Sequence, residues 1–543
     1  MKKNLAFEKG KSIACLLQMV TLTVCFYGCS TEDNTFTDEG SGTLEFSIGG
    51  ISEGSEETLT KAGAGSETVF VAPQADGLFL SGTMTADSGV STRAGSPMAA
   101  GNQYRLVVYS GETIAGSVDG TAGGTVPRIT GLAAGTYTVV AYSFNSTTLP
   151  AAGTSISVPA GTDLLYFSQT GVTVTSGGST SVAVVFSHKF SSLSVVPDAR
   201  ALVLDPAYAT THDIGETVMA VTATISGSCP ATMSVSDGNL TAGTATTANI
   251  SWPAGGLGWQ KIPPSNSIYI YTNGASSFTL TFTSITFGSG ATFTNKSVVF
   301  NQAMSVGTKY CTWTTFRKLC GAYVMVGGQR SWKEFHCWNL GADTSLDPND
   351  MEQTNAWGLN GAYIQWGKRG PDITGDSSVD WITADNDGPG GFAAAPTGSD
   401  SGAAAPSGWS YTFAGNYAWS TYDGAKTSND PCPAGYRVPT YSEWDRLSQT
   451  NVTYWSGTWQ ANVTNYGSAI HCGVDGIKIL TLPAAGFRIG GSLDYRGSKG
   501  HYWSSTESGA SSVAWELSFS PGFVSMDGLQ SRISGLSVRC VAE

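Results

Sequence analysis

Histidine and cysteine are the side chains in this sequence best suited to chemistry, because both bind metals and both act in catalysis. The 543 residues include five His and ten Cys. His336 precedes Cys337, and His471 precedes Cys472. Neighbouring residues of a strand point to opposite faces, so neither pair has the geometry of metal ligands. The metalloprotease pattern HExxH and the phosphate-binding pattern GxxxxGK are absent from the sequence. We therefore predict a protein that is not an enzyme and has no metal site and no cofactor.

Carboxylates gather in the Gly-rich stretch between residues 341 and 408. Oxygen-rich loops can hold calcium, but we favour solvated acidic loops and leave calcium open. The formal net charge of −13 argues against nucleic acid as a partner, since phosphates require basic patches. The acidic residues are Asp343, Asp347, Asp350, Asp372, Asp376, Asp380, Asp385 and Asp387.

Tryptophan is concentrated late in the chain, with 13 of the 15 residues at or beyond position 313. Exposed aromatic rings stack on sugars and anchor protein interfaces, whereas buried rings fill a core. Four Trp in loop-like surroundings form our predicted ligand-binding surface: Trp381, Trp409, Trp455 and Trp459. Four others are assigned to the core: Trp338, Trp366, Trp444 and Trp503.

Residues 1–28 have the pattern of a secretory signal peptide. Lys2 and Lys3 precede an apolar stretch that is too short to span a membrane, which takes about 20 apolar residues. The Gly28-Cys29 step resembles the lipobox of bacterial lipoproteins, which implies that Cys29 is lipidated. The acidic residues that follow resemble the export tag of Bacteroidetes lipoproteins, which implies a surface-exposed place at the cell outer membrane. The alternative is an ordinary signal peptide with an incidental cysteine.

The elements that position these residues are predicted to be strands. Short alternating segments are separated by Gly, Asn-Gly and Asp-Gly, and Gly numbers 68. The pattern predicts a mainly β protein with a tether at 29–42, β-sandwiches at 43–187 and 188–318, and a different domain at 319–543. Asn273-Gly274 favours a tight hairpin turn. The main strand candidates are residues 44–48, 69–72, 78–80, 104–109, 135–144, 182–186, 193–196, 218–225, 268–271, 278–287 and 298–300.

Four phrases in the first 318 residues carry a resemblance to a known family. They are YRLVVYSG, GLAAGTYTVVAYSFNS, FSHKFSSLSVV and MSVGTKYCTWTTF. In this order they resemble the fimbrillin family of Bacteroidetes pilus subunits, over about residues 43–318. The resemblance implies two transthyretin-like β-sandwiches and donor-strand exchange with other fimbrillin subunits.

The same resemblance implies that a trypsin-like cleavage removes the first strand. Lys61 lies in LTKAGAG and Arg93 in STRAGS, small-residue surroundings that proteases cut readily. The first strand candidate precedes Lys61, which makes Lys61 the better positional candidate, whereas Arg93 better matches an arginine-specific protease. An uncleaved chain that keeps its lipid stays the alternative.

The last domain contains a clear local signal in CPAGYRVPTYSEWDRL, which begins at Cys432. Thr440 and Glu443 have capping-box spacing, so we predict a helix from Tyr441 to Ser448 that turns Trp444 and Leu447 to the core. With FHCWNLGAD, GAYIQWGKRGP, LPAAGFR, HYWSST and GLSVRCVAE, this phrase resembles the Fibrobacter succinogenes major paralogous domain. That family implies a C-type-lectin-like α+β fold.

The lectin-like resemblance also implies a disulfide between Cys432 and Cys540. The pairing of the five other cysteines beyond the lipobox stays open, and one thiol is expected to be free because seven is odd. These residues are Cys229, Cys311, Cys320, Cys337 and Cys472. The sugar-binding triplets of C-type lectins, Glu-Pro-Asn or Gln-Pro-Asp with Trp-Asn-Asp, are absent, which argues against calcium-dependent sugar binding.

Together these features predict a pilus tip adhesin that accepts a donor strand and displays a lectin-like domain to an unknown glycan or protein receptor. Only three residues follow Cys540 in the expected last strand, so we expect no strand for donation there. The alternatives are an unpolymerised surface lipoprotein that binds glycan or protein, and an enzyme of the formylglycine-generating type.

Overall fold

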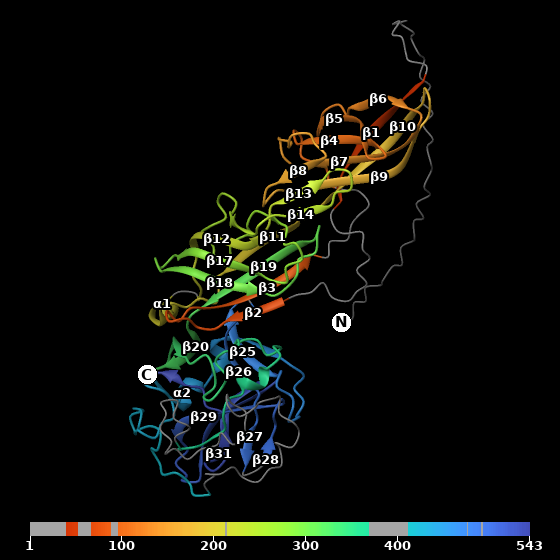
Figure 1. Ribbon diagram of the computed structural model, residues 1–543. Helices are drawn as coiled ribbons and strands as arrows, with labels where there is room; N and C mark the ends of the chain where they lie inside the picture. The colour runs from red at the N-terminus through yellow and green to blue at the C-terminus, as the bar shows by residue number, and fades with distance from the viewer. Residues whose placement is uncertain are drawn as a thin grey trace, which may run out of the picture.

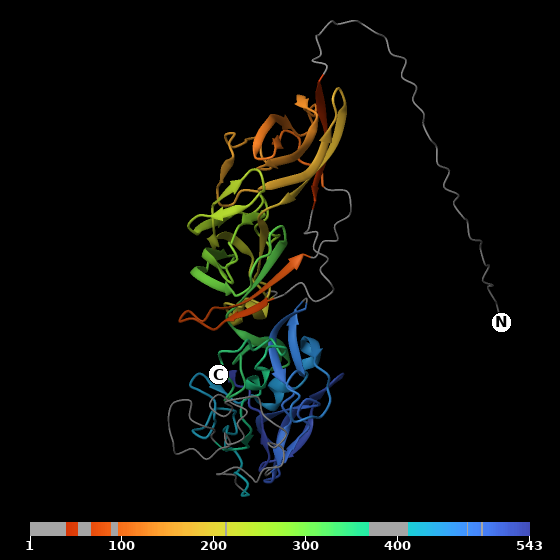
Figure 2. The ribbon, with the colours of Figure 1, turned by 45° about the vertical axis from the view of Figure 1, so that its right-hand side comes forward.

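The computed structural model describes residues 40–52, 67–87, 96–211, 214–368, 411–474, 476–489 and 492–543. Within these ranges the chain is mainly β, and its three units lie end to end in an elongated shape (Figures 1 and 2). Several predicted positions lie outside the described residues. They are the signal peptide at 1–28, Cys29, Lys61, Arg93, Asp372, Asp376, Asp380, Trp381, Asp385, Asp387 and Trp409.

The first sandwich is one seven-stranded sheet that curls around its own core, with strand order β5-β4-β7-β9-β10-β1-β6. In β10, Val182, Val184 and Phe186 are buried and alternate with exposed residues, which is the period of a half-buried strand. The edge strands β5 and β6 approach closely, since a Cβ on Gly116 would lie 2.7 Å from Ile129. Its strands are β1 (Ser41–Ser52), β4 (Gln103–Ser110), β5 (Thr113–Thr121), β6 (Arg128–Ala133), β7 (Gly135–Ser143), β9 (Leu165–Val174) and β10 (Ser179–His188).

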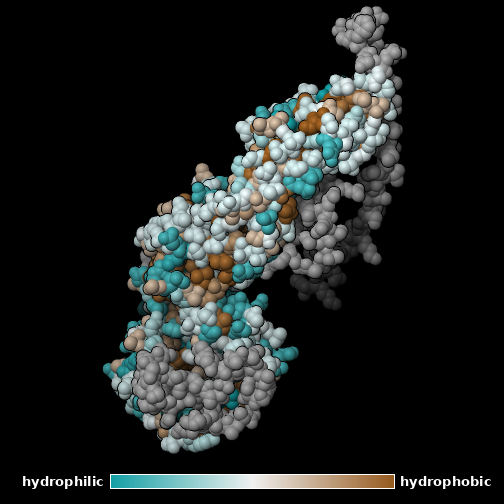
Figure 3. All heavy atoms as spheres, in the orientation of Figure 1, coloured by the Kyte–Doolittle hydropathy of each residue, from teal (hydrophilic) through white to brown (hydrophobic). Residues whose placement is uncertain are grey.

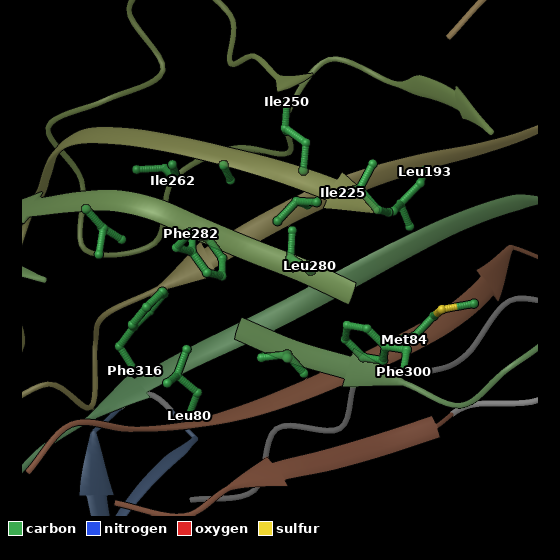
Figure 4. Close-up of a cluster of buried hydrophobic side chains, with 14 of the residues drawn as sticks. Leu80, Met84, Leu193, Ile225, Ile250, Ile262, Leu280, Phe282, Phe300 and Phe316 are labelled. Carbon is green, nitrogen blue, oxygen red and sulfur yellow. The ribbon is translucent and has the colours of Figure 1, made fainter. Parts of the chain in front are cut away.

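The second sandwich packs a five-stranded sheet, β16-β11-β19-β3-β2, against a four-stranded sheet, β15-β12-β17-β18. Apolar side chains from both sheets meet between them, among them Leu80, Phe282 and Phe316 (Figure 4). The first sheet contains β2 (Glu67–Val71), β3 (Phe79–Asp87), β11 (Ser191–Asp198), β16 (Ile268–Ile270) and β19 (Lys309–Arg317). The second contains β12 (Val218–Ser228), β15 (Thr246–Ile250), β17 (Phe278–Phe287) and β18 (Thr292–Phe300).

The placement of β2 and β3 corrects the expected boundary between the sandwiches. Our prediction put all of residues 43–187 in the first sandwich, but β3 pairs antiparallel with β19 from Phe79↔Arg317 to Asp87↔Lys309. Leu80 and Met84 of β3 are fully buried in the second core. The described chain therefore passes from the first sandwich to the second, returns at β4, and crosses again after β10. Alternation in sequence marks a half-buried strand but does not say which sheet receives it.

A small sheet and a hydrophobic cluster join the two sandwiches. The small sheet consists of β8 (Ser155–Val158), β13 (Ala231–Ser234) and β14 (Leu240–Ala242), in the order β14-β13-β8. Because β8 precedes β10 and β13 follows β12, their pairing ties the two units together. Phe190, in the two-residue link between β10 and β11, stacks on Tyr271 with ring centroids 5.3 Å apart. His188 and Asp163 lie 2.6 Å apart beside this link.

The described residues of the terminal domain, from residue 320 onward, form four small sheets and very little helix. Its sheets have the orders β20-β21-β33-β23, β22-β32-β27-β28, β24-β25-β26 and β29-β30-β31. The strands are β20 (Cys320–Val326), β21 (Gln329–Phe335), β22 (Ile364–Gln365), β23 (Tyr436–Arg437), β24 (Val452–Ser456), β25 (Ala469–Val474), β26 (Ile477–Pro483), β27 (Phe487–Ile489), β28 (Ser492–Asp494), β29 (Gly500–Glu507), β30 (Val513–Ser520), β31 (Phe523–Ser531), β32 (Gly535–Leu536) and β33 (Val541–Ala542). The helical segments are η1 (Ala356–Leu359), α2 (Tyr441–Trp444) and α3 (Leu447–Thr450), with α1 (Pro206–Thr211) in the second sandwich.

The predicted single helix from Tyr441 to Ser448 is wrong. The chain breaks between α2 and α3, where Arg446 adopts a left-handed φ of 61°. The capping signal is nevertheless used, because the Thr440 amide donates to a Glu443 carboxylate oxygen at 2.8 Å. Trp444 and Leu447 are both fully buried in one core, as the spacing predicted. The break is therefore compatible with burial of both side chains, which the helix rule alone could not reveal.

The joint between the second sandwich and the terminal domain is short and packed. Two residues separate β19 from β20. Ala201 and Val203 of the second sandwich form a buried cluster with Tyr323, Trp332 and Ile479 of the terminal domain. The Tyr323 hydroxyl also donates to the Ala209 carbonyl at 2.8 Å. This joint holds the two units in one relative orientation.

Hydrophobic residues on the face seen in Figure 3 gather over the second sandwich, around β17 and β18. Among the described residues, no helix combines the length and the apolar character that crossing a bilayer demands.

Replacing Leu80 by Ala tests the placement of β3. The change leaves a cavity in the second core and should cost about 2–5 kcal/mol of unfolding free energy. Hydrogen exchange should show faster opening of β19 amides, whereas Leu529→Ala, at a side chain 49% exposed, should leave them unchanged. Faster exchange confined to β4 and β7 would contradict the placement.

Candidate functional site

β1 occupies an interior position of the first sandwich although it comes from the start of the described chain. It pairs parallel with β10 from Thr43↔Ser179 to Ser52↔Ser187. On its other side it pairs antiparallel with β6, for example Leu44 with Ile129. Both backbone edges of the strand are therefore used, and each neighbour would have an unpaired edge without it.

The side chains of β1 also complete the core. Leu44 is fully buried, and Phe46 and Ile51 are 8% and 6% exposed. A bulge between Ile48 and Gly50 inserts one residue, so Ile51 returns to the core-facing side. Gly50 has a φ of 100°, a conformation that side chains other than glycine rarely adopt. Without β1 the first sandwich would therefore have an apolar groove at this position, which we call the seat of β1, with a space for each buried side chain.

The tail of the chain is fixed within the terminal domain. Val541 is buried and pairs with Phe335 of β21 and with Arg437 of β23. A disulfide joins Cys540 to Cys432, the pair that the lectin-like resemblance implies. Residues 537–541 are at most 2% exposed. This segment is therefore committed to its own domain.

Arg539 shows how closely the tail is integrated. Its buried guanidinium donates to the Asn339 side-chain oxygen at 3.0 Å and to the Thr481 and Cys337 carbonyls at 2.8 and 2.9 Å. Burial lowers the pKa of Arg539 to about 10. A buried cation bonded to three segments of chain would be costly to expose or to leave without acceptors.

Asp430 organises the backbone around the disulfide. Its two carboxylate oxygens accept the amides of Cys432 and Val438 at 2.8 and 2.9 Å. Burial raises the pKa of Asp430 to about 6, although these hydrogen bonds and the nearby Lys426 and Arg437 oppose the rise. The carboxyl group therefore titrates in a mildly acidic range.

Among the tryptophans predicted to bind ligand, Trp455 and Trp459 are only partly exposed. Their rings meet edge to face at 5.3 Å, and Trp459 also contacts Phe519 at 6.4 Å. Both pack against the core of the terminal domain. The four tryptophans assigned to the core are buried, namely Trp338, Trp366, Trp444 and Trp503.

The sequence reasoning missed two exposed tryptophans of the second sandwich. Trp259 is 65% exposed and Trp313 is 38% exposed. Trp259 lies in a Gly- and Pro-rich loop, GLGWQKIPP, which was a usable signal for an exposed ring. Trp313 lies inside a phrase of the fimbrillin resemblance, MSVGTKYCTWTTF, which predicts a strand but does not show that the Trp313 side chain is on its exposed face.

The remaining cysteines and histidines form no metal centre within the described part of the chain, where no cluster of three His, Cys, Asp or Glu could hold an ion. Cys320 and Cys337 form a second disulfide. Among the described cysteines, three thiols are free: Cys229, Cys311 and Cys472. His471 is buried and bonds Thr481 and Ser456 at 2.8 Å each, while Cys472 lies in the core of the terminal domain.

Comparison with known families gives one match. A domain of unknown function, DUF8237, matches residues 450–541, which lie in the terminal domain and make up well under half of the chain. None of the curated proteins matches the chain. The lectin-like identity of this domain stays a prediction.

Among solved structures, a proposed cell adhesion protein from Bacteroides uniformis is 18% identical, with a TM-score of 0.28 over 44% of this chain and 90% of that one. Another from Bacteroides fragilis is 13% identical, with a TM-score of 0.32 over 54% and 97%. The fimbrial anchor protein Mfa2 from Porphyromonas gingivalis is 10% identical, with a TM-score of 0.24 over 39% and 78%. At these scores and identities the likeness carries no argument about the function of this chain.

Loss of the tail disulfide should destabilise the terminal domain more than loss of the other one. The two bridges span sequence separations of 108 and 17 residues. The chain-entropy model gives a difference of about 1.6 kcal/mol. Urea denaturation of the Cys432→Ala/Cys540→Ala and Cys320→Ala/Cys337→Ala proteins measures this difference in unfolding free energy. A larger loss in the Cys320→Ala/Cys337→Ala protein would contradict the prediction.

Asp430 should make the stability of the terminal domain depend on pH. The folded pKa of Asp430, about 6, lies above the ordinary value of 3.8. The stability that the protonated carboxyl group contributes is therefore fully present below pH 3.8 and is lost as pH rises through 6. The unfolding free energy should fall by about 2–3 kcal/mol across this window. In the Asp430→Asn protein this part of the pH slope should vanish, and an unchanged slope would assign it to other groups.

Proposed function

We propose that this protein is a subunit of a bacterial surface fibre, which accepts a strand from a neighbouring subunit at the seat of β1. The observation that carries the proposal is the double pairing of β1, with β10 on one side and β6 on the other. A strand supplied in trans would restore both ladders and refill the pockets of Leu44 and Phe46.

The position of β1 in the chain supports its removal. It precedes the predicted cleavage residues, and the next described strand, β2, belongs to the other sandwich. A cut after Lys61 would separate β1 alone from the rest. A cut after Arg93 would also separate β3, which pairs along nine positions with β19 and buries Leu80 and Met84 in the second core. We infer that Lys61 is the cut that frees the seat.

The other end of the molecule supports display at the tip of the fibre. The terminal domain lies at the end opposite the first sandwich (Figures 1 and 2). Residues 537–541 are buried there and Cys540 is bonded to Cys432, so this segment does not serve as a donor strand. In our proposal the chain therefore accepts a strand and presents its terminal domain outward as an adhesin. Cys29 carries the lipid that brings the precursor to the outer membrane.

A second candidate is a surface lipoprotein that keeps β1 and its lipid and does not polymerise. The same contacts favour it, because β1 is fully integrated into the first sandwich before any cleavage. In that case the molecule would bind glycan or protein as a monomer at the cell surface. The two candidates differ in the fate of residues 41–52 in the mature protein.

Cleavage followed by peptide binding distinguishes them. After digestion with a trypsin-like protease, the protein should bind a synthetic peptide of residues 41–52. A Phe46→Asp peptide should bind at least about tenfold more weakly, because it would bury a charge. The Lys61→Ala protein should resist release of β1, and Arg93→Ala should not. Fluorescence polarisation measures binding, with the uncut protein as the control.

If circular dichroism shows that the cleaved protein is still folded and the peptide does not bind, the seat of β1 does not exchange strands. Mature protein from cells that retains a lipidated Cys29 would favour the monomeric lipoprotein.

A further inference from the structure

Two exposed tryptophans form an aromatic platform on the outer face of the second sandwich. Trp313 and Trp259 line a shallow open hollow of about 500 Å³ together with Pro263 and Pro264. The Lys261 ammonium lies 4.0 Å from the centre of the Trp313 ring. Rings of this size are usually covered in a soluble protein, so their exposure on one surface points to a ligand.

The fold fixes the position of both rings. Tyr310, Thr312, Thr314 and Phe316 of β19 are buried, so Trp313 projects from the opposite face of the strand. The segment after Trp259 runs along β11, where the Ser265 amide bonds the Val195 carbonyl at 2.9 Å. The platform is therefore built on a rigid sheet and a tethered loop, which favours a preformed site.

The platform continues into a polar groove between the second sandwich and the terminal domain. Trp313 lines both hollows, and the second has a volume of about 680 Å³. One wall carries the Thr83 and Thr315 hydroxyls of the sheet, and the other carries Asp350 and Glu352 of the terminal domain. Hydroxyl and carboxylate groups thus begin where the aromatic surface ends.

The base of this arrangement is a buried polar network. Arg317 donates to the Ser81 hydroxyl at 2.7 Å, and Ser81 in turn bonds Asp347. Two further donors of lining residues, Arg317 Nε and Asn349 Nδ2, have no hydrogen-bond partner among the described residues. Asn349 is only 4% exposed. Both donors are buried in the wall of the groove, where a donor without an acceptor costs stability.

We propose that the aromatic platform and the polar groove together bind a neutral oligosaccharide. A pyranose ring presents an apolar face of C–H groups, which packs on an aromatic ring, and a rim of hydroxyls, which both donate and accept hydrogen bonds. The aromatic platform can pack against the apolar face of the sugar, and the polar groups of the groove can hydrogen-bond to its hydroxyls. Charges of both signs line the groove, so neither an anion nor a cation is strongly favoured over a neutral ligand. The lining carboxylates are Asp347, Asp350 and Glu352, and the lining cations are Arg317 and Lys478.

The site is complete within one chain and does not need strand exchange; it rests on the proposed adhesive role only for its biological use. A proline-rich peptide is the competing occupant of an aromatic hollow, but such a peptide would leave the hydroxyl and carboxylate walls of the groove unused. An oligosaccharide would contact both the platform and the groove, whereas a proline-rich peptide would contact the platform alone.

The test uses the intact, uncut protein and immobilised neutral polysaccharides: linear β-glucan, mannan, xylan and desialylated mucin glycans. At least one should be bound, and calorimetry with its hexasaccharide, or with the released neutral mucin glycans, should give a dissociation constant. Trp259→Ala and Trp313→Ala should each weaken binding about tenfold or more, because each removes a stacking surface. Phe523→Ala, at a ring 56% exposed in the terminal domain, is the matched control and should change nothing.

Trp259 is largely exposed, so its replacement should leave the melting temperature unchanged and the variant remains informative. Binding to none of the four polysaccharides, or binding that survives both tryptophan changes, would overturn the proposal. Binding of a polyproline peptide at the platform without sugar binding would overturn it in favour of a peptide. These results are independent of strand exchange, because the seat of β1 stays filled throughout.

Discussion

Both sandwich cores are closed by apolar side chains from the first strands of the described chain. Leu44 and Phe46 of β1 fill the first core, while Leu80 and Met84 of β3 fill the second. Because β1 and β3 come from neighbouring segments, one stretch of chain contributes to both units. The hydrophobic burial that stabilises the sandwiches also determines what proteolysis of that stretch can release. The proposed assembly and its preferred cleavage residue both follow from this arrangement.

The terminal domain relies on a different kind of interaction. Its largest buried side chains include Arg488, Arg496, Arg532 and Arg539 as well as tryptophans. Arg532 donates to the carbonyls of Val513, Ala414 and Ala510, as Arg539 does to other segments. Each guanidinium offers five donors in a fixed fork, so one side chain can satisfy several loops that have no ladder of their own. This explains how a domain with short strands and little helix keeps a defined shape.

The sequence was informative about local structure and less so about pairing. The strand predicted at residues 278–287 coincides with β17, because its apolar residues alternate and its ends are marked by turn residues. Asn273 and Gly274 do adopt positive φ values of 49° and 73°. The predicted hairpin is nevertheless wrong, since β16 pairs with β11 and β17 pairs with β12 and β18. Which strands meet depends on long-range burial that no local pattern encodes. The same limit hid the platform at Trp259 and Trp313, whose rings come from separate segments.

The two-residue passage from β19 to β20 has a mechanical consequence. The strand at the centre of the second sandwich continues almost directly into the first strand of the terminal domain, and the packed contacts of Tyr323 and Trp332 brace that passage. A pulling force applied to the terminal domain would travel along this strand into a sheet, where hydrogen bonds on both sides of β19 resist in shear. Such a connection transmits load without a compliant hinge, so a surface-bound molecule would respond to flow as a stiff rod.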